Sequence, residues 1–191
     1  MMPLQTVTPE PIRGDWLYEQ RNPLVPLVDV EMGGVGYQNP DEGLAVKLWT
    51  VEYRAGSMYL RADGVPEMLL FSRAGVTEVA LAFDTNMNPL VGFTDGSGTT
   101  FWYFNSLTNQ MEFFPYLPAG SHSLRATLDD RRTLASPTSD IVIAYIRSGN
   151  LYMRQQRDRY QDEYLLATDA GSRIMQMGMT KVNRVQLRLV P

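Results

Sequence analysis

Residues 140–166 constrain the fold more than any other stretch, because they predict three consecutive β-strands. Residues 141–147 are rich in β-branched and aromatic side chains, which favour extended backbone. Residues 151–156 then alternate apolar and polar side chains, as a half-buried strand does. The tripeptide Ser-Gly-Asn at 148–150 predicts a tight hairpin between them, since Gly and Asn tolerate the positive φ of such turns. A third strand is predicted over residues 161–166.

The same unit recurs along the chain. Residues 55–61 (AGSMYLR) match residues 148–154 (SGNLYMR) in type at nearly every position, and a middle copy begins with DGSG at residue 95. The glycines that mark the three hairpins are Gly56, Gly98 and Gly149, which lie 42 and 51 residues apart. Spacings of about 40 to 50 residues are typical of propeller blades and related arrays. The pattern predicts an all-β fold of repeated antiparallel β-meanders, β-propeller-like, although unrelated hairpins of an ordinary all-β protein would also supply such glycines.

Three such units and a terminal strand pair are predicted. The units span residues 43–71, 76–116 and 123–166, and two further strands are predicted over 174–180 and 185–189. Two strands without a third are expected to complete a sheet begun elsewhere, and the first unit is the obvious candidate. Residues 154–164 are rich in helix formers, but their position after a clear hairpin favours strand and turn.

Residues 1–40 differ in character from the β-propeller-like domain predicted over residues 41–191. They hold six of the 12 prolines, which fix φ and lack a backbone donor, so this segment is predicted to add no central strand. It is nevertheless rich in large apolar residues, in which a disordered tail would be poorer. We interpret it as an extended arm that docks on its own domain or on a neighbouring subunit. The candidate contact residues are Trp16, Tyr18, Leu24, Val25 and Leu27.

A GGxG pattern lies within this arm, at Gly33, Gly34 and Gly36. A phosphate-binding P-loop needs a following Lys-Ser/Thr pair and a strand-to-helix context, and neither is present. A flexible turn is predicted instead.

Charge and cysteine content narrow the function classes. The net charge is −4 at pH 7, which argues against a direct nucleic-acid binder with a basic face. The chain has no Cys and a single His, His122, so thiolate chemistry and a His-based metal cluster are excluded, and no cofactor is expected. No window approaches the roughly 18 apolar residues of a membrane helix, and the N-terminus lacks the features of a signal peptide. These features predict a folded protein made in a reducing cytosol, with no membrane partner.

Asp84, Asn86 and Asn88 alternate like the start of a calcium-binding loop. Pro89 occupies the place of the glycine that permits the sharp turn, and Asp95 stands where such a loop has Glu. An ordinary Asn/Pro turn is therefore predicted.

The adjacent carboxylates Asp129 and Asp130 follow a predicted strand over residues 124–128. Successive residues on a strand point to opposite faces, so the two carboxylates do not converge on one bond as a general acid/base pair would. Arg131 and Arg132 follow them directly, which favours salt-bridged loop charges. A further run of arginines between residues 147 and 159 lies among acidic residues and predicts an ion-paired sheet face.

A dense aromatic block lies at residues 101–104 (FWYF) and 111–116 (MEFFPY). Bulky residues on both faces of a strand predict core or subunit-interface packing, with Trp102 buried. Aromatic rings also stack on sugars, so the alternative is a glycan or partner contact. The residues of that contact would be Trp102, Tyr103, Asp129 and Asp130.

Four stretches carry a further signal: VALAFDTNMNPLVGF, SLRATLDDRR, SDIVIAYIRSGNLYMRQQRDRYQDEYLLA and IMQMGMTKVNRVQLRLV. Over roughly residues 76–190 they resemble a family of virion-associated structural proteins of tailed bacteriophages, whose genes usually lie among tail or tail-fibre genes. The N-terminal arm is the least matched part. The resemblance implies a role in the particle and not a reaction.

The expectation is therefore a structural subunit of a phage tail or head-to-tail assembly, which acts as a docking platform for other virion proteins such as tail, fibre or connector subunits. Such a subunit is assembled in the host bacterial cytoplasm, resides in the virion tail, and forms a homo-oligomer that buries its edge strands. The alternative is a receptor- or glycan-binding module at the tail tip. A hydrolase such as a depolymerase is a third alternative. Enzymatic activity is not expected, because the sequence contains no His-based constellation and no carboxylate pair with supporting geometry.

Overall fold

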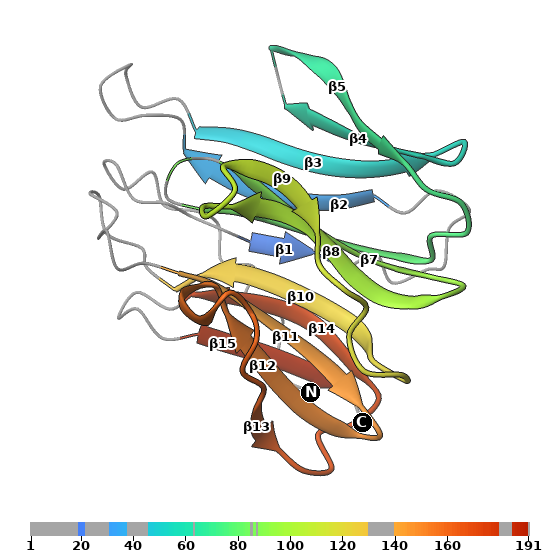
Figure 1. Cartoon of the computed structure of the whole chain (residues 1–191), viewed down its shortest axis with the longest axis vertical. Helices are drawn as coiled ribbons and strands as arrows, with labels where there is room; N and C mark the ends of the chain where they lie inside the picture. The colour runs from blue at the N-terminus through green and yellow to red at the C-terminus, as the bar shows by residue number, and fades with distance from the viewer. Residues whose placement is uncertain are drawn as a thin grey trace, which may run out of the picture.

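The computed structural model describes residues 19–21, 31–37, 46–62, 64–84, 86, 88–129, 140–179 and 185–190, and it is built from antiparallel β-strands (Figure 1). The strands form a seven-stranded sheet of order β15-β14-β1-β2-β3-β4-β5 and two four-stranded sheets, which we call the β6–β9 sheet and the β10–β13 sheet. The prediction of an all-β fold is thus confirmed. Each sheet keeps two outer strands within the described chain, where no closed propeller is formed.

Apart from β1 and β2, the strands lie close to their predicted positions. The seven-stranded sheet contains β1 (Glu19–Arg21), β2 (Glu31–Tyr37), β3 (Val46–Arg54), β4 (Ser57–Ala62), β5 (Val65–Ser72), β14 (Arg173–Met179) and β15 (Val185–Val190). The β6–β9 sheet contains β6 (Glu78–Phe83), β7 (Pro89–Asp95), β8 (Gly98–Asn105) and β9 (Gln110–Phe113). The β10–β13 sheet contains β10 (His122–Leu128), β11 (Ile141–Arg147), β12 (Asn150–Gln155) and β13 (Tyr164–Ala167). A 3₁₀ turn, η2 (Gln156–Asp158), separates β12 from β13 where strand and turn are expected.

The first and third meanders contain the same hairpin between their second and third strands, as the repeat predicts. The β3–β4 loop is Ala55-Gly56, with φ of 49° and 79°, and the β11–β12 loop is Ser148-Gly149, with φ of 51° and 75°. Positive φ at both loop residues is the geometry of a type I′ turn, whose twist matches that of the paired strands. The middle meander joins β7 to β8 through Gly96 and Ser97, neither of which has a φ in the left-handed region, so its turn is of another type; its positive φ, 136°, is at Gly98, the first residue of β8.

The first strand of the first meander comes from the segment that its prolines predict to be an arm. β2 pairs with β3 along its whole length, from Glu31 opposite Glu52 to Tyr37 opposite Val46. β1 lies between β2 and β14. The expectation that residues 1–40 add no central strand is therefore wrong for β1 and β2. The reason is that every proline of this segment lies outside the two strands, so neither strand loses a backbone donor.

The GGxG pattern lies inside β2, so the predicted flexible turn is also wrong. Glycine in a strand often marks a place where another backbone approaches closely, because the missing Cβ leaves room. β2 pairs with β1 and β3 and also lies against β6. Gly33, Gly34 and Gly36 therefore belong to a strand with neighbours on several sides.

β14 and β15 complete the same sheet as the first meander, as predicted, but they join it through β1. The β1–β14 pairing runs from Glu19 opposite Gly178 to Arg21 opposite Gln176. Strands from the two ends of the chain thus meet in the middle of one sheet (Figure 1).

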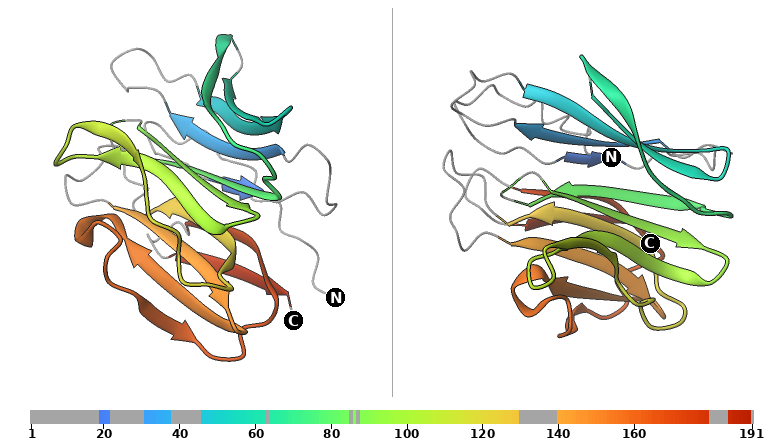
Figure 2. Two further views of the ribbon diagram at one scale, coloured as in Figure 1. Left: turned by 45° about the vertical axis from the view of Figure 1, so that its right-hand side comes forward. Right: turned by 45° about the horizontal axis from the view of Figure 1, so that its top comes forward.

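The three meanders follow one another in chain order through the molecule, from cyan through green to orange in Figure 2. The first strands of the second and third meanders, β6 and β10, lie side by side at the centre. A Cβ at Gly92 would lie 2.2 Å from Leu124 Cδ2, so the close approach of these two sheets requires glycine there. Ser123 joins all three sheets, because its N–H donates to Glu78 Oε2 at 2.8 Å and its Oγ accepts the N–H of Ile174 at 2.9 Å.

Aromatic side chains fill the interfaces between neighbouring sheets. On one face of the β6–β9 sheet, Trp102 lies 5.4 Å from Phe71 of β5 between ring centroids. On the opposite face, Phe101 stacks on Phe114 at 4.6 Å and meets Tyr160 at 4.8 Å. Residues 101–104 and Phe114 of the aromatic block are therefore packed, as predicted, whereas Phe113 and Tyr116 are exposed. Trp102 itself is half-buried rather than buried, because it packs on only one neighbouring sheet.

Candidate docking surface

The candidate contact residues of the arm lie outside the residues that the structure describes. They are Trp16, Tyr18, Leu24, Val25 and Leu27, and Asp130 of the candidate glycan contact lies outside as well. A docking role for these residues stays a prediction.

Trp102 and Tyr103 do not form one aromatic platform. They point to opposite faces of β8, where Trp102 contacts Phe71 and Tyr103 lies 5.4 Å from Tyr160. Burial raises the pKa of Tyr103, and the nearby charge of Glu112 adds to the shift. Both rings are thus used mainly to join sheets within the chain.

Asp129 is salt-bridged, as predicted, and its observed partner is Arg157. Asp129 Oδ1 accepts the N–H of Asp140 at 2.8 Å, and Oδ2 pairs with Arg157 Nη2 at 3.1 Å. The carboxylate of Asp140 accepts a hydrogen bond from Arg157 Nε. Burial raises the pKa of Asp140, and the hydrogen bond from Arg157 opposes that shift. This arrangement ties the end of β10 to η2 and leaves these carboxylates engaged inside the protein.

Asp84 is likewise engaged by its own turn. Its Oδ1 accepts the N–H groups of Asn86 and Asn88, both at 2.8 Å, and its Oδ2 accepts Asn88 Nδ2 at 2.9 Å. The predicted Asn/Pro turn is therefore confirmed. Among the described residues, no group of three or more His, Cys, Asp or Glu side chains is arranged to hold a metal ion.

The predicted ion-paired sheet face is present on the β10–β13 sheet, where we call it the third-meander cluster. Arg147 and Arg154 both pair with Glu163, at 2.6 Å and 3.3 Å. The Arg147 guanidinium lies 4.2 Å above the centroid of the Tyr152 ring. The hydroxyl of Tyr145 donates to Glu163 and accepts from Arg154 Nε.

An equivalent first-meander cluster lies on β3, β4 and β5. Arg54 and Arg61 both approach Glu67, at 2.7 Å and 3.6 Å, and the Arg54 guanidinium lies 4.4 Å above the Tyr59 ring. Glu52 pairs with Arg61 at 3.1 Å. In both clusters the arginine charge is offset by neighbouring carboxylates, so neither forms a basic stripe for nucleic acid.

The outer strands of the sheets expose large apolar side chains. β5, β9 and β13 each end a sheet. The exposed apolar residues of these strands, which we call the edge-strand surface, are Met68, Leu69, Phe113, Tyr164, Leu165 and Leu166. Leu69 is 61% exposed and Leu165 is 55% exposed. Apolar side chains on an unpaired strand edge favour pairing with another chain, so this surface is the best candidate for a functional site in the described part of the molecule.

The three edges differ in how strongly they resist pairing. β5 contains Pro66 and pairs with β4 through two register shifts, and β9 has four residues and is soon followed by Pro115. Proline and bulges both hinder the addition of a strand. β13 also has four residues and pairs with β12 through one register shift, but it contains no proline, none follows it closely, and it has three consecutive exposed apolar residues. β13 is therefore the most accessible of the three edges.

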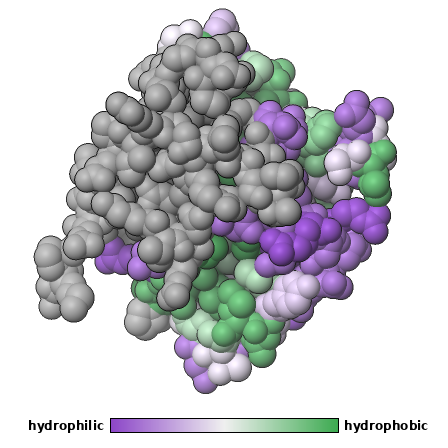
Figure 3. Space-filling view, turned by 90° about the vertical axis from the view of Figure 1, so that its left-hand side faces the viewer, coloured by the Kyte–Doolittle hydropathy of each residue, from purple (hydrophilic) through white to green (hydrophobic). Residues whose placement is uncertain are grey.

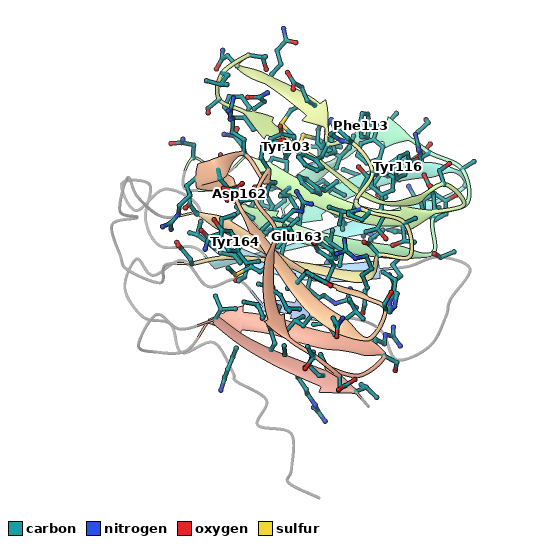
Figure 4. All side chains as sticks on the ribbon, turned by 60° about the horizontal axis from the view of Figure 1, so that its bottom comes forward. Tyr103, Phe113, Tyr116, Asp162, Glu163 and Tyr164 are labelled. Atoms are coloured by element: carbon teal, nitrogen blue, oxygen red, sulfur yellow. The ribbon has the colours of Figure 1, made fainter. Side chains whose placement is uncertain are left out.

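Exposed aromatic rings accompany these edges. Figure 4 shows Phe113 and Tyr116 of the second meander near each other, and Tyr164 of β13 apart from them beside Asp162 and Glu163. The hydroxyl of Tyr116 donates to Asp95 Oδ2 at 3.1 Å, so that ring is held in place at the surface.

The edge-strand surface was not predicted from the sequence. Which strand is outermost depends on the order of strands in the sheets, and a list of strands along the chain does not give that order. The run Tyr164-Leu165-Leu166 was a signal for this surface. A strand with one solvent-exposed face should alternate apolar and polar residues, so three consecutive apolar residues place at least one apolar side chain in solvent.

Comparison with models of known protein families gives no match to this chain, and comparison with curated proteins gives none either. Within the part of the chain that the structure describes, no helix has the length and apolar character of a membrane span. The function is therefore inferred from the surface chemistry of the molecule.

Proposed function

We propose that this chain is a structural subunit of a bacteriophage tail or head-to-tail assembly, in which it acts as a docking platform for other virion proteins. The observation that carries the proposal is the edge-strand surface, which places exposed apolar side chains on an outer strand of all three sheets. A protein that works alone usually blocks or covers such edges, whereas a subunit covers them with its neighbours. The resemblance of residues 76–190 to virion structural proteins supports the same role.

The interior of the molecule supports a rigid platform. Aromatic contacts join β5 to the β6–β9 sheet and join that sheet to the residues after η2. Ser123 and Glu78 link β10 to β6 by a partly buried hydrogen bond. A body of this kind holds its outer strands in fixed relative positions, as a docking platform requires.

The acidic side chains support binding rather than catalysis. Asp84, Asp129, Asp140 and Glu163 each accept hydrogen bonds from backbone or arginine groups of the same chain. A general acid or base needs a carboxylate that can reach a substrate. These contacts favour a structural use of the four carboxylates.

The test is mass spectrometry of particles purified from the phage that encodes the chain. A structural subunit is expected to remain with intact tails at a fixed copy number, after assembly in the host cytoplasm. Leu69→Lys and Phe113→Lys should fold and yet fail to enter particles, because each places a charge on the edge-strand surface. Leu107→Lys is the matched control, since Leu107 is 69% exposed but lies in the turn between β8 and β9. Absence of the wild-type protein from purified particles would falsify the proposal.

The alternative function is a receptor- or glycan-binding module at the tail tip. Tyr116 and Tyr164 favour it, because both rings are exposed and both hydroxyls lie on carboxylates, Asp95 and Asp158. Exposed aromatic faces beside carboxylates can stack on sugars and hydrogen-bond their hydroxyls. If Tyr116→Ala and Tyr164→Ala particles assemble normally but no longer attach to host cells, this alternative replaces the docking role.

A further inference from the structure

We propose that two copies of this chain form a twofold dimer in which β13 of each copy pairs with β15 of the other. The inference deepens the proposed function and rests on it, because both assign outer strands to contacts between subunits. In this dimer β13 contacts a second copy of the chain, and β5 and β9 stay available for contacts with other virion proteins.

Both strands have an edge to which another strand can add. In the described part of the chain, β13 pairs only with β12, and β15 pairs only with β14. Neither strand contains a proline. Each therefore presents backbone N–H and C=O groups that a strand from another chain can pair with.

The two edges lie at the same end of the molecule. Ala167 of β13 and Leu187 and Leu189 of β15 pack against one small core cluster, which includes Ile146 and Ile174. Figure 4, in which the bottom of Figure 1 comes forward, shows both β13 and the β14–β15 pair toward the viewer. Figure 3 shows hydrophobic side chains gathered at this lower end of the visible face.

This placement suits a twofold axis. β13 and β15 belong to two different sheets that pack on each other, so a second copy turned by 180° can bring its β15 to β13 and its β13 to β15. A twofold interface contains each contact twice, which is the commonest arrangement in soluble homo-oligomers. A single strand-to-strand contact is thus doubled in one dimer.

Charge selects this pairing over the other twofold arrangements. β13 is flanked in sequence by Asp162 and Asp169, whereas β15 contains the exposed Arg188. A dimer that pairs β13 with β13 would bring acidic residues together, and a dimer that pairs β15 with β15 would bring the two copies of Arg188 together. Pairing β13 with β15 places opposite charges together at both contacts, and like-charge contacts are strongly disfavoured at interfaces.

Apolar burial adds to the attraction. Leu165 and Leu166 are exposed on β13, and Val185 and Leu187 are only partly buried on β15. A neighbouring strand would cover them, and interface cores are richer in apolar side chains than the rest of a surface.

The experiment measures the mass of the full-length protein by native mass spectrometry and sedimentation. The wild type is expected to be a dimer. Leu165→Lys alters β13, and the double variant Gln186→Glu/Arg188→Glu alters the exposed face of β15. Each variant alone should be a monomer, with the affinity of the dimer weakened by at least about tenfold, because the homodimer loses both of its contacts.

Mixing the two variants is the decisive step. The mixed dimer retains one unaltered contact, and its other contact places a lysine against two glutamates. A heterodimer of intermediate mass should therefore form where neither variant dimerises alone. Leu107→Lys, at an exposed position away from both strands, should remain a dimer. Circular dichroism confirms folding, and Leu165→Ser replaces Leu165→Lys if the lysine variant is not folded.

Three outcomes overturn the inference. A monomeric wild type does so directly. A dimeric β15 variant together with a monomeric β13 variant assigns the contact to β13 with β13, and dimers of both variants place the interface elsewhere. The proposed function is tested separately by the particle composition: a monomer found in virions overturns only the dimer, and a dimer absent from virions overturns only the virion role.

Discussion

The first-meander and third-meander clusters share two arginines, a tyrosine beneath one of them and a glutamate that both arginines approach, but they differ in contact with water. The side chains of Arg61 and Arg54 are 51% and 42% exposed, whereas those of Arg154 and Arg147 are 12% and 21% exposed. The hairpins that carry them are of the same type. The repeat in the sequence therefore reproduces the geometry of the cluster, while packing around each copy sets how much its ion pairs contribute to stability.

The two clusters also balance charge differently. The first meander places two carboxylates, Glu52 and Glu67, against its two arginines. In the third meander the position of Glu52 is taken by Tyr145, since each lies opposite the tyrosine of the next strand. Arg154 compensates by donating from Nη1 to the carbonyl oxygen of Tyr160 at 2.6 Å. The third-meander cluster thus fixes the segment between η2 and β13, whereas the first-meander cluster contacts only neighbouring strands.

The largest expected effect is the loss of the shared carboxylate in the third-meander cluster. Glu163→Gln should lower the free energy of unfolding by about 3 kcal/mol, because it leaves two poorly hydrated arginines without their counter-charge. Glu67→Gln is the matched change in the first meander and should have a much smaller effect, since exposed ion pairs contribute little. Urea unfolding of both variants measures the difference. Equal losses in the two variants would show that exposure does not separate the clusters.

Acid should remove part of the same stabilisation. Burial raises the pKa of Glu163, but hydrogen bonds from Arg147 and Tyr145 outweigh burial, so the pKa lies below the ordinary value of a glutamate. A lowered folded-state pKa means that the stabilisation is present above about pH 4.5 and is lost as the pH falls through the folded-state value. The stability difference between wild type and Glu163→Gln should therefore shrink from pH 7 to about pH 3. A constant difference across that range would contradict the pairing of Glu163.

A smaller effect is expected from the buried phenol. Tyr145→Phe should cost about 1 to 2 kcal/mol, because the hydroxyl of this buried residue bonds both Glu163 and Arg154. Tyr53→Phe in the first meander is the control, since its hydroxyl accepts one exposed backbone N–H, from Gly75. Thermal unfolding of the two variants compares them. A larger loss in Tyr53→Phe would reverse the order of the two clusters.

The smallest effect concerns the rings beneath the arginines. Tyr152→Leu should lose about 0.5 to 1 kcal/mol of cation–π stabilisation, because the ring lies under a largely buried guanidinium. Tyr59→Leu should change the stability less, since water competes for Arg54. Chemical unfolding at low and high salt distinguishes the two, as salt screens the exposed contact more.

The repeat was predictable because it depends on short-range chemistry. Gly56 and Gly149 stand where a type I′ turn needs positive φ, and the residues that meet this requirement are neighbours in the sequence. The ion-paired face could also be predicted, since Arg147, Arg154 and Glu163 lie within one meander. Local signals of this kind are visible without knowledge of the sheet order.

The central position of β1 and β2 was not predictable from composition. Proline content averages over residues 1–40, whereas the sheet requires only that the residues within each strand keep their donors. The edge-strand surface was missed for a related reason. Leu69 and Leu165 are exposed only because β5 and β13 are outermost, and this follows from pairings between distant parts of the chain.

The pairing of β1 with β14 sets the order in which the chain can fold during synthesis. Glu19 is opposite Gly178, so β1 leaves the ribosome long before its partner exists. The β6–β9 and β10–β13 sheets use consecutive strands and can form as soon as they are made, whereas the seven-stranded sheet must wait for the last residues. Contacts between distant residues slow folding and leave unpaired strands open to wrong partners in the meantime. A ribosome-bound chain that ends before residue 173 is therefore expected to hold two finished sheets and one interrupted sheet, with β1 unpaired on its β14 side.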